Sequence, residues 1–178
     1  NGSIYFAGED VSGLSLSQRR DRGIHWLPEN PLEEALLPDR PLWENFLLGR
    51  QRERRFRRSG FLQKEEIIRF AEEEVRANNI AASEVDEPLA GLSGGNRQKV
   101  ALARVLAGAV RLAIIEQPCR GLDLHASGRI RARLSELARA GKITLVVISY
   151  DLDELLAICD RVAVLYGGEV VGIAERSA

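Results

Sequence analysis

Two short apolar segments with a helical segment between them place the strongest limit on the fold of this chain. LAIIEQ (112–117) and ITLVVISY (143–150) are apolar almost throughout and rich in β-branched residues, which is typical of strands buried on both faces. Between them, 126–141 has the pattern of a helix that ends at Gly141, and 152–159 predicts a further helix. The sequence therefore predicts an α/β fold with a mostly parallel sheet that is buried on both sides.

The remaining segments predict strands near both ends of the chain and helices in the middle. Short strands are expected at 3–8, ending in a turn at Gly8, and at 23–30, where Pro28 ends the strand. The segment 161–175 predicts a hairpin that turns at two glycines. Helices are expected in three places: from about Leu42, over 61–79, and from Asn96 to about Leu106. We expect one domain whose parts are the α/β core at 1–40 and 110–178 and a helical subdomain at 41–109.

Composition excludes several classes of protein. The formal net charge is -1, which points to neither nucleic acid nor an acidic tail as a partner. The two cysteines, Cys119 and Cys159, are too few and too far apart for a disulfide framework or a zinc site, and neither His25 nor His125 has a metal-ligand spacing. The absence of any methionine suggests that the chain is part of a longer protein.

The segment LSGGNRQK (92–99) places a serine and two glycines where a helix begins. Ser93, Gly94 and Gly95 add almost no side chain there, so the first backbone N–H groups of the helix remain bare at the positive end of its dipole. Such a helix N-terminus can bind a phosphate group. The usual phosphate loop, G-x-x-x-x-G-K-[ST], occurs nowhere in the chain, so the sequence leaves open whose phosphate is bound.

Four stretches in fixed order carry a resemblance to a known family. They are LPEN (27–30), LSGGNRQK (92–99), AIIEQPCRGLD (113–123) and VVISYDLDEL (146–155). The set resembles the ATP-binding-cassette ATPases over residues 3 to 172, and its finer pattern is similar to the second cassette of tandem-cassette importers for simple sugars and nucleosides. The resemblance implies part of a P-loop NTPase fold of the RecA-like kind, with the first strand and the Walker A loop absent.

The resemblance implies roles for residues that bind nucleotide between two cassettes. Ser93, Gly94 and Gly95 match the signature motif, which binds the γ-phosphate of an ATP held by the Walker A loop of the opposing cassette, and Asn96 takes the next place. Two further positions match the Q-loop and the end of the D-loop, which link the ATP site to other subunits: Glu29 and Asp123.

Three positions of the cassette's own catalytic site depart from the family pattern. Glu116 stands where the Walker B aspartate contacts the water shell of magnesium, and it is one methylene longer. Gln117 stands at the catalytic glutamate, and a neutral amide cannot accept a proton from the attacking water. Tyr150 replaces the switch histidine. The resemblance therefore implies a degenerate catalytic site, and the chain alone is expected to be inactive.

The function that the resemblance implies is the coupling of ATP to the import of a simple sugar or nucleoside. ATP and Mg²⁺ are then the cofactors, a second cassette and a transmembrane permease are the partners, and the location is the cytoplasmic face of the cell membrane. No nucleic acid is expected, and an exposed sheet edge permits self-association.

Other interpretations of the same residues remain open. The domain can be a non-catalytic interaction module with an inherited fold, or a soluble nucleic-acid-associated cassette ATPase that uses the arginine run at 49–60. That run can equally be a solvated surface paired with the acidic residues of 61–79, or a contact for the membrane subunit or lipid headgroups. Glu29 can be a solvated turn acid, Glu116 a strand-end acid, and Tyr150 a buried aromatic.

Overall fold

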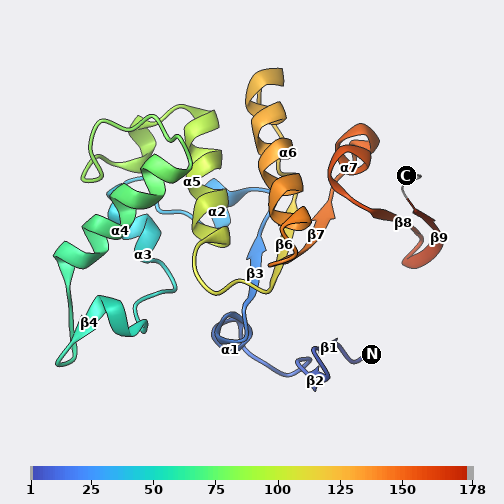
Figure 1. Ribbon diagram of the computed structural model, residues 1–178, viewed down its shortest axis with the longest axis horizontal. Coiled ribbons are helices and arrows are strands. Elements are labelled where there is room, and N and C mark those ends of the chain that lie inside the picture. The colour runs from blue at the N-terminus through green and yellow to red at the C-terminus, as the bar shows by residue number, and fades with distance from the viewer. Residues whose placement is uncertain (1, 176–178) are drawn as a thin grey trace.

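A three-stranded parallel sheet forms the centre of the computed structural model, which describes residues 2–175 (Figure 1). Its strands are β3 (Ile24–Leu27), β6 (Leu112–Glu116) and β7 (Thr144–Ile148), in the order β3-β6-β7. The parallel α/β architecture predicted from the alternation of strands and helices is confirmed. The chain thereby brings the carboxyl ends of three strands to one edge of the sheet, where polar residues follow each strand.

The other elements are helices around this sheet and three antiparallel hairpins. The α-helices are α1 (Leu16–Asp21), α2 (Pro31–Glu34), α3 (Leu42–Leu47), α4 (Lys64–Ala77), α5 (Gly94–Leu106), α6 (Leu124–Arg139) and α7 (Leu152–Ile158). Short 3-10 helices are η1 (Arg54–Phe56) and η2 (Leu89–Gly91). The hairpins pair β1 (Tyr5–Phe6) with β2 (Glu9–Asp10), β4 (Arg57–Arg58) with β5 (Phe61–Leu62), and β8 (Arg161–Tyr166) with β9 (Glu169–Glu175). Within residues 2–175, no helix has both the length and the apolar character needed to cross a bilayer.

One face of the sheet packs against α5 and α6. Leu27, Ala113 and Ile115 are fully buried on this face and share one apolar cluster with Val100 of α5 and Leu134 of α6. Burial of such side chains contributes about 1.5–3 kcal/mol each for the larger ones. The position of both helices relative to the strands is therefore fixed by the core, and the ends of both helices lie close to the strand ends.

The opposite face of the sheet is exposed, so the prediction that both faces are buried is wrong for the described chain. Trp26, Ile114 and Val146 lie side by side on this face in the strand register. Trp26 is 42%, Val146 44% and Ile148 48% exposed. The apolar, β-branched residues correctly predicted that these segments form strands. Their burial was overestimated, because α5 and α6 cover only one of the two faces of the sheet.

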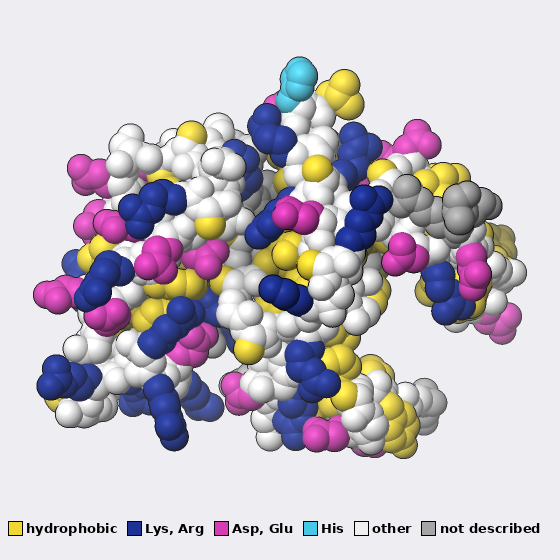
Figure 2. All heavy atoms as spheres, viewed as in Figure 1, with side chains coloured by type: hydrophobic (Ala, Val, Ile, Leu, Met, Phe, Trp, Pro, Cys, Tyr) yellow, Lys and Arg dark blue, Asp and Glu magenta, His cyan; other side chains and the backbone are white. Residues whose placement is uncertain are grey.

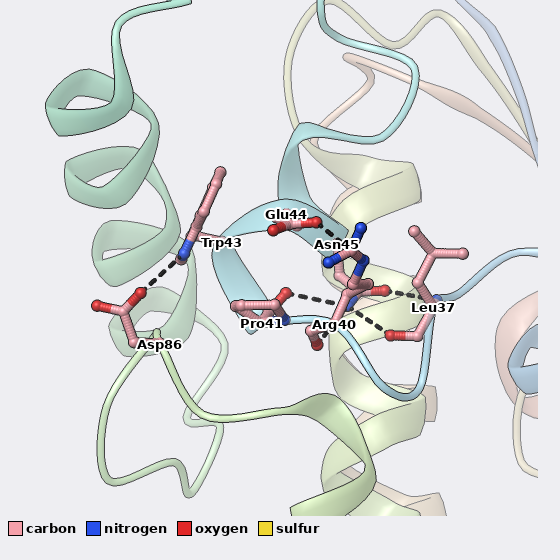
Figure 3. Close-up of polar contacts among 7 residues, drawn as sticks. All are labelled: Leu37, Arg40, Pro41, Trp43, Glu44, Asn45 and Asp86. Carbon is pink, nitrogen blue, oxygen red and sulfur yellow. Dashed lines mark hydrogen bonds and ion pairs between the residues drawn. The ribbon is translucent and has the colours of Figure 1, made fainter.

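Asn45 of α3 organises the loop that leads from the sheet into the helices on the left of Figure 1 (Figure 3). Its side-chain amide is fully buried, donates to the carbonyl oxygens of Leu37, Arg40 and Pro41 at 3.0, 3.2 and 3.1 Å, and accepts from the N–H of Leu37 at 2.8 Å. Trp43 extends the same network by donating to Asp86 at 2.9 Å. The amide is thus the partner of the Leu37 N–H and a second donor to three carbonyl oxygens that also accept backbone N–H groups, so one side chain ties the loop together.

The arginine run lies on the 3-10 helix η1 and the β4–β5 hairpin, where Figure 2 shows basic side chains extending from the molecule. Arg50 and Arg55 both pair with Glu53, at 2.9 Å each, so the acidic residues of 61–79 are partners of the run only through Glu74, which attracts both arginines at longer range. Arg55 also stacks over the rings of Phe56 and Phe70, at 4.5 and 4.2 Å from their centroids. Part of the run is therefore packed against the core while the hairpin itself is solvated.

The N-terminal segment forms a hairpin instead of the single strand expected at 3–8. Ala7 and Gly8 both have left-handed backbone angles, with φ of 51° and 84°, and they turn the chain so that β2 pairs with β1. Two successive residues with positive φ are the geometry of a tight hairpin turn. The turn expected at Gly8 is confirmed, while Ala7, an uncommon residue in this conformation, starts it one residue earlier.

Candidate functional site

The first turn of α5 presents bare backbone donors to solvent, as the Ser93-Gly94-Gly95 sequence predicted. Ser93 precedes the helix with φ −62° and ψ 156°, and its side chain does not cap the helix. Within the described chain, the N–H groups of Gly94, Gly95 and Asn96 donate to no other group. Ser93 and Gly94 are exposed, so an anion can reach these donors at the positive end of the helix dipole.

Asn96 holds the serine hydroxyl in place beside these donors. Its amide nitrogen donates to Ser93 Oγ at 3.1 Å, and its Oδ1 accepts from the N–H of Ala81 at 3.0 Å. Because Ser93 Oγ accepts this bond, the hydroxyl hydrogen remains available for an anion. Asn96 therefore orients Ser93 and anchors the start of α5 to the loop around Ala81.

The start of α5 is packed against the loop that follows β6. Gln98 donates to the carbonyl oxygen of Pro118 at 3.0 Å, and the side chain of Leu122 lies 3.9 Å from the position that a Cβ on Gly95 would take. The loop ends at Asp123, whose carboxylate caps α6 by accepting from the N–H of Ala126 at 2.8 Å. That hydrogen bond lowers the pKa of Asp123, so the residue stays charged at the helix start.

Glu116, at the end of β6, is held by a residue that the sequence analysis did not single out. Trp26 of the neighbouring strand donates its indole N–H to Glu116 Oε1 at 2.7 Å. Both side chains lie on the open face of the sheet, because strand residues alternate between faces and Trp26 pairs in register with Ile114, two residues before Glu116. One carboxylate oxygen is thus engaged and the other is free to face a ligand.

The free oxygen of Glu116 fits an outer contact to Mg²⁺. Magnesium usually keeps several waters and takes one or two carboxylates together with phosphate oxygens. Residues 2–175 contain no cluster of three or more His, Cys, Asp or Glu side chains that could hold a metal. A magnesium ion here would therefore depend on nucleotide phosphates and water for most of its ligands, with Glu116 as the carboxylate nearest to it.

Gln117 follows Glu116 in an unusual backbone conformation. Its φ is 45°, which is left-handed and uncommon for a residue other than glycine, and such positions are concentrated at functional sites. Its N–H donates to the carbonyl oxygen of Ile148 at 2.8 Å, and its Oε1 lies 3.5 Å from the hydroxyl oxygen of Ser149, whose single hydrogen is donated to Glu154. The amide is thereby held at the carboxyl edge of the sheet, where it can orient water but cannot accept a proton.

Tyr150 lies at the same edge and points into solvent. It is 89% exposed, so the interpretation of Tyr150 as a buried aromatic is wrong. It lies two residues after the end of β7, while Gln117 directly follows the adjacent strand β6, and these two strand ends are neighbours in the parallel sheet. The phenol is thus available to a ligand or to another protein.

A buried polar cluster supports the loop that carries Tyr150. Ser149 accepts from the N–H of Asp151 at 3.1 Å and donates to the carboxylate of Glu154, which is only 3% exposed. Burial, followed by its contact with Glu154, raises the pKa of the Cys119 thiol to about 12, so this thiol stays protonated and unreactive at neutral pH. Glu154 is the residue of this cluster that the sequence pattern did not reveal.

Glu29 is paired rather than solvated, which contradicts its interpretation as a free turn acid. Its carboxylate forms an ion pair with Arg120, in the loop between β6 and α6. Both side chains are partly exposed, at 35% for Glu29 and 56% for Arg120, so the pair contributes little to stability. Its effect is geometric, because it ties the segment after β3 to the loop that also contacts the start of α5.

The described geometry therefore brings most of the predicted residues to one end of the molecule. Glu29, Glu116, Gln117 and Tyr150 follow strand ends at the carboxyl edge of the sheet, which is where open α/β sheets bind ligands. The bare turn at Ser93 lies beside the loop after β6, on a separate element. The arrangement presents two surfaces: a strand-end surface with weak acid–base groups, and a helix start that can bind a phosphate.

Comparison with known proteins gives the same family over most of the chain. A family model described as ABC transporter matches residues 1–120. The chain is 38% identical over 177 residues to the putative ribose/galactose/methyl galactoside import ATP-binding protein 1 of Rhizobium meliloti (strain 1021). It is 30% identical over 177 residues to the ribose import ATP-binding protein of Lactococcus lactis subsp. lactis (strain IL1403). Both matches cover 99% of this chain and 35% of the relative, so the chain spans about a third of the length of these proteins.

A solved structure shows the same fold. The chain is similar, with a TM-score of 0.80 and 24% sequence identity, to a dimeric post-hydrolysis state of an ATP-binding cassette bound to ADP and Pi. That similarity covers 100% of this chain and 75% of the solved one. With the family model matching two thirds of its residues, this chain belongs to the ABC transporter family and has the α/β fold of its ATP-binding cassettes.

Proposed function

We propose that this chain is part of the nucleotide-binding component of an importer for simple sugars or nucleosides, and that it contributes to ATP-driven transport mainly through its signature motif. The observation that carries the proposal is the first turn of α5, where three successive N–H groups are bare and Ser93 keeps a free hydroxyl hydrogen. The printed names of relatives that import ribose and galactose support the substrate class.

The two surfaces of the site have unequal roles in this proposal. The helix start at Ser93–Gly95 binds the γ-phosphate of an ATP held by the Walker A loop of a second cassette. Glu116, Gln117 and Tyr150 would face this cassette's own nucleotide, where Glu116 would hold Mg²⁺ through a water molecule. Gln117 orients the attacking water without accepting its proton, so hydrolysis at this second site is slow. ATP supplies the phosphates and Mg²⁺ neutralises part of their charge when both are bound.

The partners in this proposal are a second cassette and a transmembrane permease. The Glu29–Arg120 pair links the Q-loop position to the loop that contacts the start of α5, so a movement at Glu29 is passed to the signature motif. The loop held by Asn45 follows Glu29 along the chain and provides a rigid surface for contact with the permease. The protein would then work at the cytoplasmic face of the membrane.

Restoring the family residues at the strand ends tests the degenerate site. Glu116→Asp, Gln117→Glu and Tyr150→His are combined in the intact protein, with the Walker A lysine of the other cassette removed so that only this cassette's own site can turn over. We expect ATP hydrolysis to rise by about 10²–10⁴-fold over the unmodified site, the usual effect of a positioned general base. Tyr150 is exposed and Gln117→Glu is nearly isosteric, so the fold should tolerate the changes.

The control is Glu116→Asp alone, which leaves the neutral amide in place and should give no gain. Phosphate release is measured under saturating Mg²⁺-ATP. If the unmodified site already hydrolyses ATP as fast as the triple variant, Gln117 and Tyr150 are not defects, and the asymmetric account of the two sites fails.

A further inference from the structure

A cavity of about 350 Å³ lies at the end of β3 opposite to Glu29. Its walls are the end of α1, the end of α3 with the loop that follows it, and the last turn of α5. The signature motif is at the other end of α5, which is roughly 20 Å away at the rise of an α-helix. The cavity is therefore distinct from the signature motif, whereas Trp26, which also lines it, connects it to Glu116 on the strand-end surface.

Arginines dominate the charge of this cavity. Four of them line it, against two carboxylates: Arg20, Arg50, Arg52 and Arg104 face Asp21 and Glu53. Glu53 is shared with Arg55, which lies outside the cavity lining. In the described part of the chain, no carboxylate lies within ion-pair distance of Arg20, Arg52 or Arg104. The cavity thus has an excess of positive charge without a counterion.

Arg50 is a buried cation with an unused donor. It is 6% exposed, and it donates through Nε to Glu53 at 2.9 Å and through Nη2 to the carbonyl oxygen of Ala107 at 2.7 Å. Its third nitrogen, Nη1, has no hydrogen-bond partner among residues 2–175. That nitrogen is sealed from solvent, and the guanidinium also lies over the ring of Phe70, at 5.0 Å from its centroid. Arg50 is therefore a buried charge with incomplete hydrogen bonding beneath the cavity.

Arg104 and Arg20 extend the same cationic surface. Arg104 donates to the carbonyl oxygen of Ala35, and burial together with the nearby charges of Arg20 and Arg50 lowers the pKa of Arg104 to about 10. The guanidinium of Arg20 lies where a Cβ on Gly49 would be. Glycine at that position, with φ 77°, is therefore needed for the guanidinium to enter the cavity wall.

Capping of α5 explains only part of this arrangement. The carbonyl oxygens of the last turn are satisfied by Arg50 and by the ring of His25, whose Nδ1 lies 2.7 Å from the oxygen of Val105. Such contacts suit the negative end of a helix dipole. They require one cation, and they leave Arg20 and Arg104 close to Arg50, where Glu53 and the more distant Glu74 offset only part of the repulsion.

We propose that this cavity binds a small soluble molecule bearing a phosphate group, held by Arg20 and Arg104 with Arg50 beneath them. Planar guanidinium groups donate paired N–H bonds to phosphate oxygens, and a multivalent anion offsets several of the crowded charges at once. The volume of the cavity is sufficient for a phosphate with a small group attached to it. The inference does not depend on the transport function, because it uses none of the nucleotide-site residues.

Titration calorimetry of the intact protein with sodium pyrophosphate at low ionic strength tests the proposal. Beyond any binding at the nucleotide sites, we expect one binding event for each copy of the cavity, and this event should be weakened at least about tenfold in Arg104→Gln and in Arg20→Gln. Arg58→Gln, on the exposed β4–β5 hairpin, is the matched charge-removal control and should bind as the unmodified protein does. Gly94→Ala is the second control, since it alters the nucleotide site and leaves this cavity intact.

Thermal unfolding separates a binding role from a structural one. Pyrophosphate should raise the Tm of the unmodified protein and of Arg58→Gln, and it should have little effect on Arg104→Gln or Arg20→Gln. Without the anion, both cavity variants should be as stable as the unmodified protein or more so, because removal of one charge relieves repulsion. No binding of pyrophosphate, or unchanged affinity in both cavity variants, would overturn the proposal. Loss of Tm in both variants with an intact pyrophosphate response would do the same.

Discussion

Replacement of Asn45 by alanine is expected to lower the free energy of unfolding by about 2–4 kcal/mol. The fully buried amide donates to three backbone carbonyl oxygens and accepts from one N–H, all between residues 37 and 41. Alanine leaves the N–H of Leu37 without a partner, removes one of the two hydrogen bonds that each carbonyl oxygen accepts, and adds a void next to Leu37. Equilibrium unfolding in urea, followed by tryptophan fluorescence, measures the loss.

Asn78→Ala is the matched control for this prediction. Asn78 is also an asparagine at a helix end and donates to the carbonyl oxygen of Glu74 at 2.9 Å, but it is half-buried, so water can replace its bonds. Asn78→Ala should lower the free energy of unfolding by about 1 kcal/mol or less. A loss for Asn45→Ala no larger than that of Asn78→Ala would mean that the loop is not organised by this side chain.

Replacement of Gly94 by alanine is expected to reduce ATP turnover by the intact protein about 10²–10³-fold while its Tm is kept or raised. A Cβ on Gly94 meets no atom within 4 Å inside the chain, and its φ is not left-handed. Alanine is also a better helix residue than glycine, by about 1 kcal/mol. The substitution therefore changes only how closely a phosphate can approach the bare N–H groups.

Gly128→Ala in α6 provides the comparison, because a Cβ there also meets no atom within 4 Å. It should stabilise the helix without any change in turnover. If Gly94→Ala retained full activity, or lost activity only in proportion to a lower Tm, the first turn of α5 would not be a phosphate site.

The parts of the site that the sequence predicted are those formed by neighbouring residues. The helix start is formed by the consecutive residues Ser93, Gly94 and Gly95, and the absence of large side chains there can be read directly from the sequence. In the same way, apolar β-branched runs gave β6 and β7 within one or two residues of their bounds. Local propensity and periodicity were sufficient for these elements.

The contacts that tune the site join residues far apart in the chain, and no local pattern predicts them. Trp26 and Glu116 meet because β3 and β6 pair in one register, and Glu29 meets Arg120 for the same reason. The cationic cavity is a similar case. Its arginines come from separate segments, and each one in isolation has the appearance of an ordinary surface residue.

The central claim is that the signature motif of this chain binds a phosphate held by another cassette, and a crosslink tests it most directly. Ser93 is exposed, so Ser93→Cys in the intact protein is treated with an ATP analogue that carries a thiol-reactive group on its γ-phosphate. We predict labelling of this position that is lost when the Walker A lysine of the opposing cassette is replaced. It should persist when this cassette's own Walker A lysine is replaced. The reverse dependence, or labelling that needs neither lysine, would contradict the account.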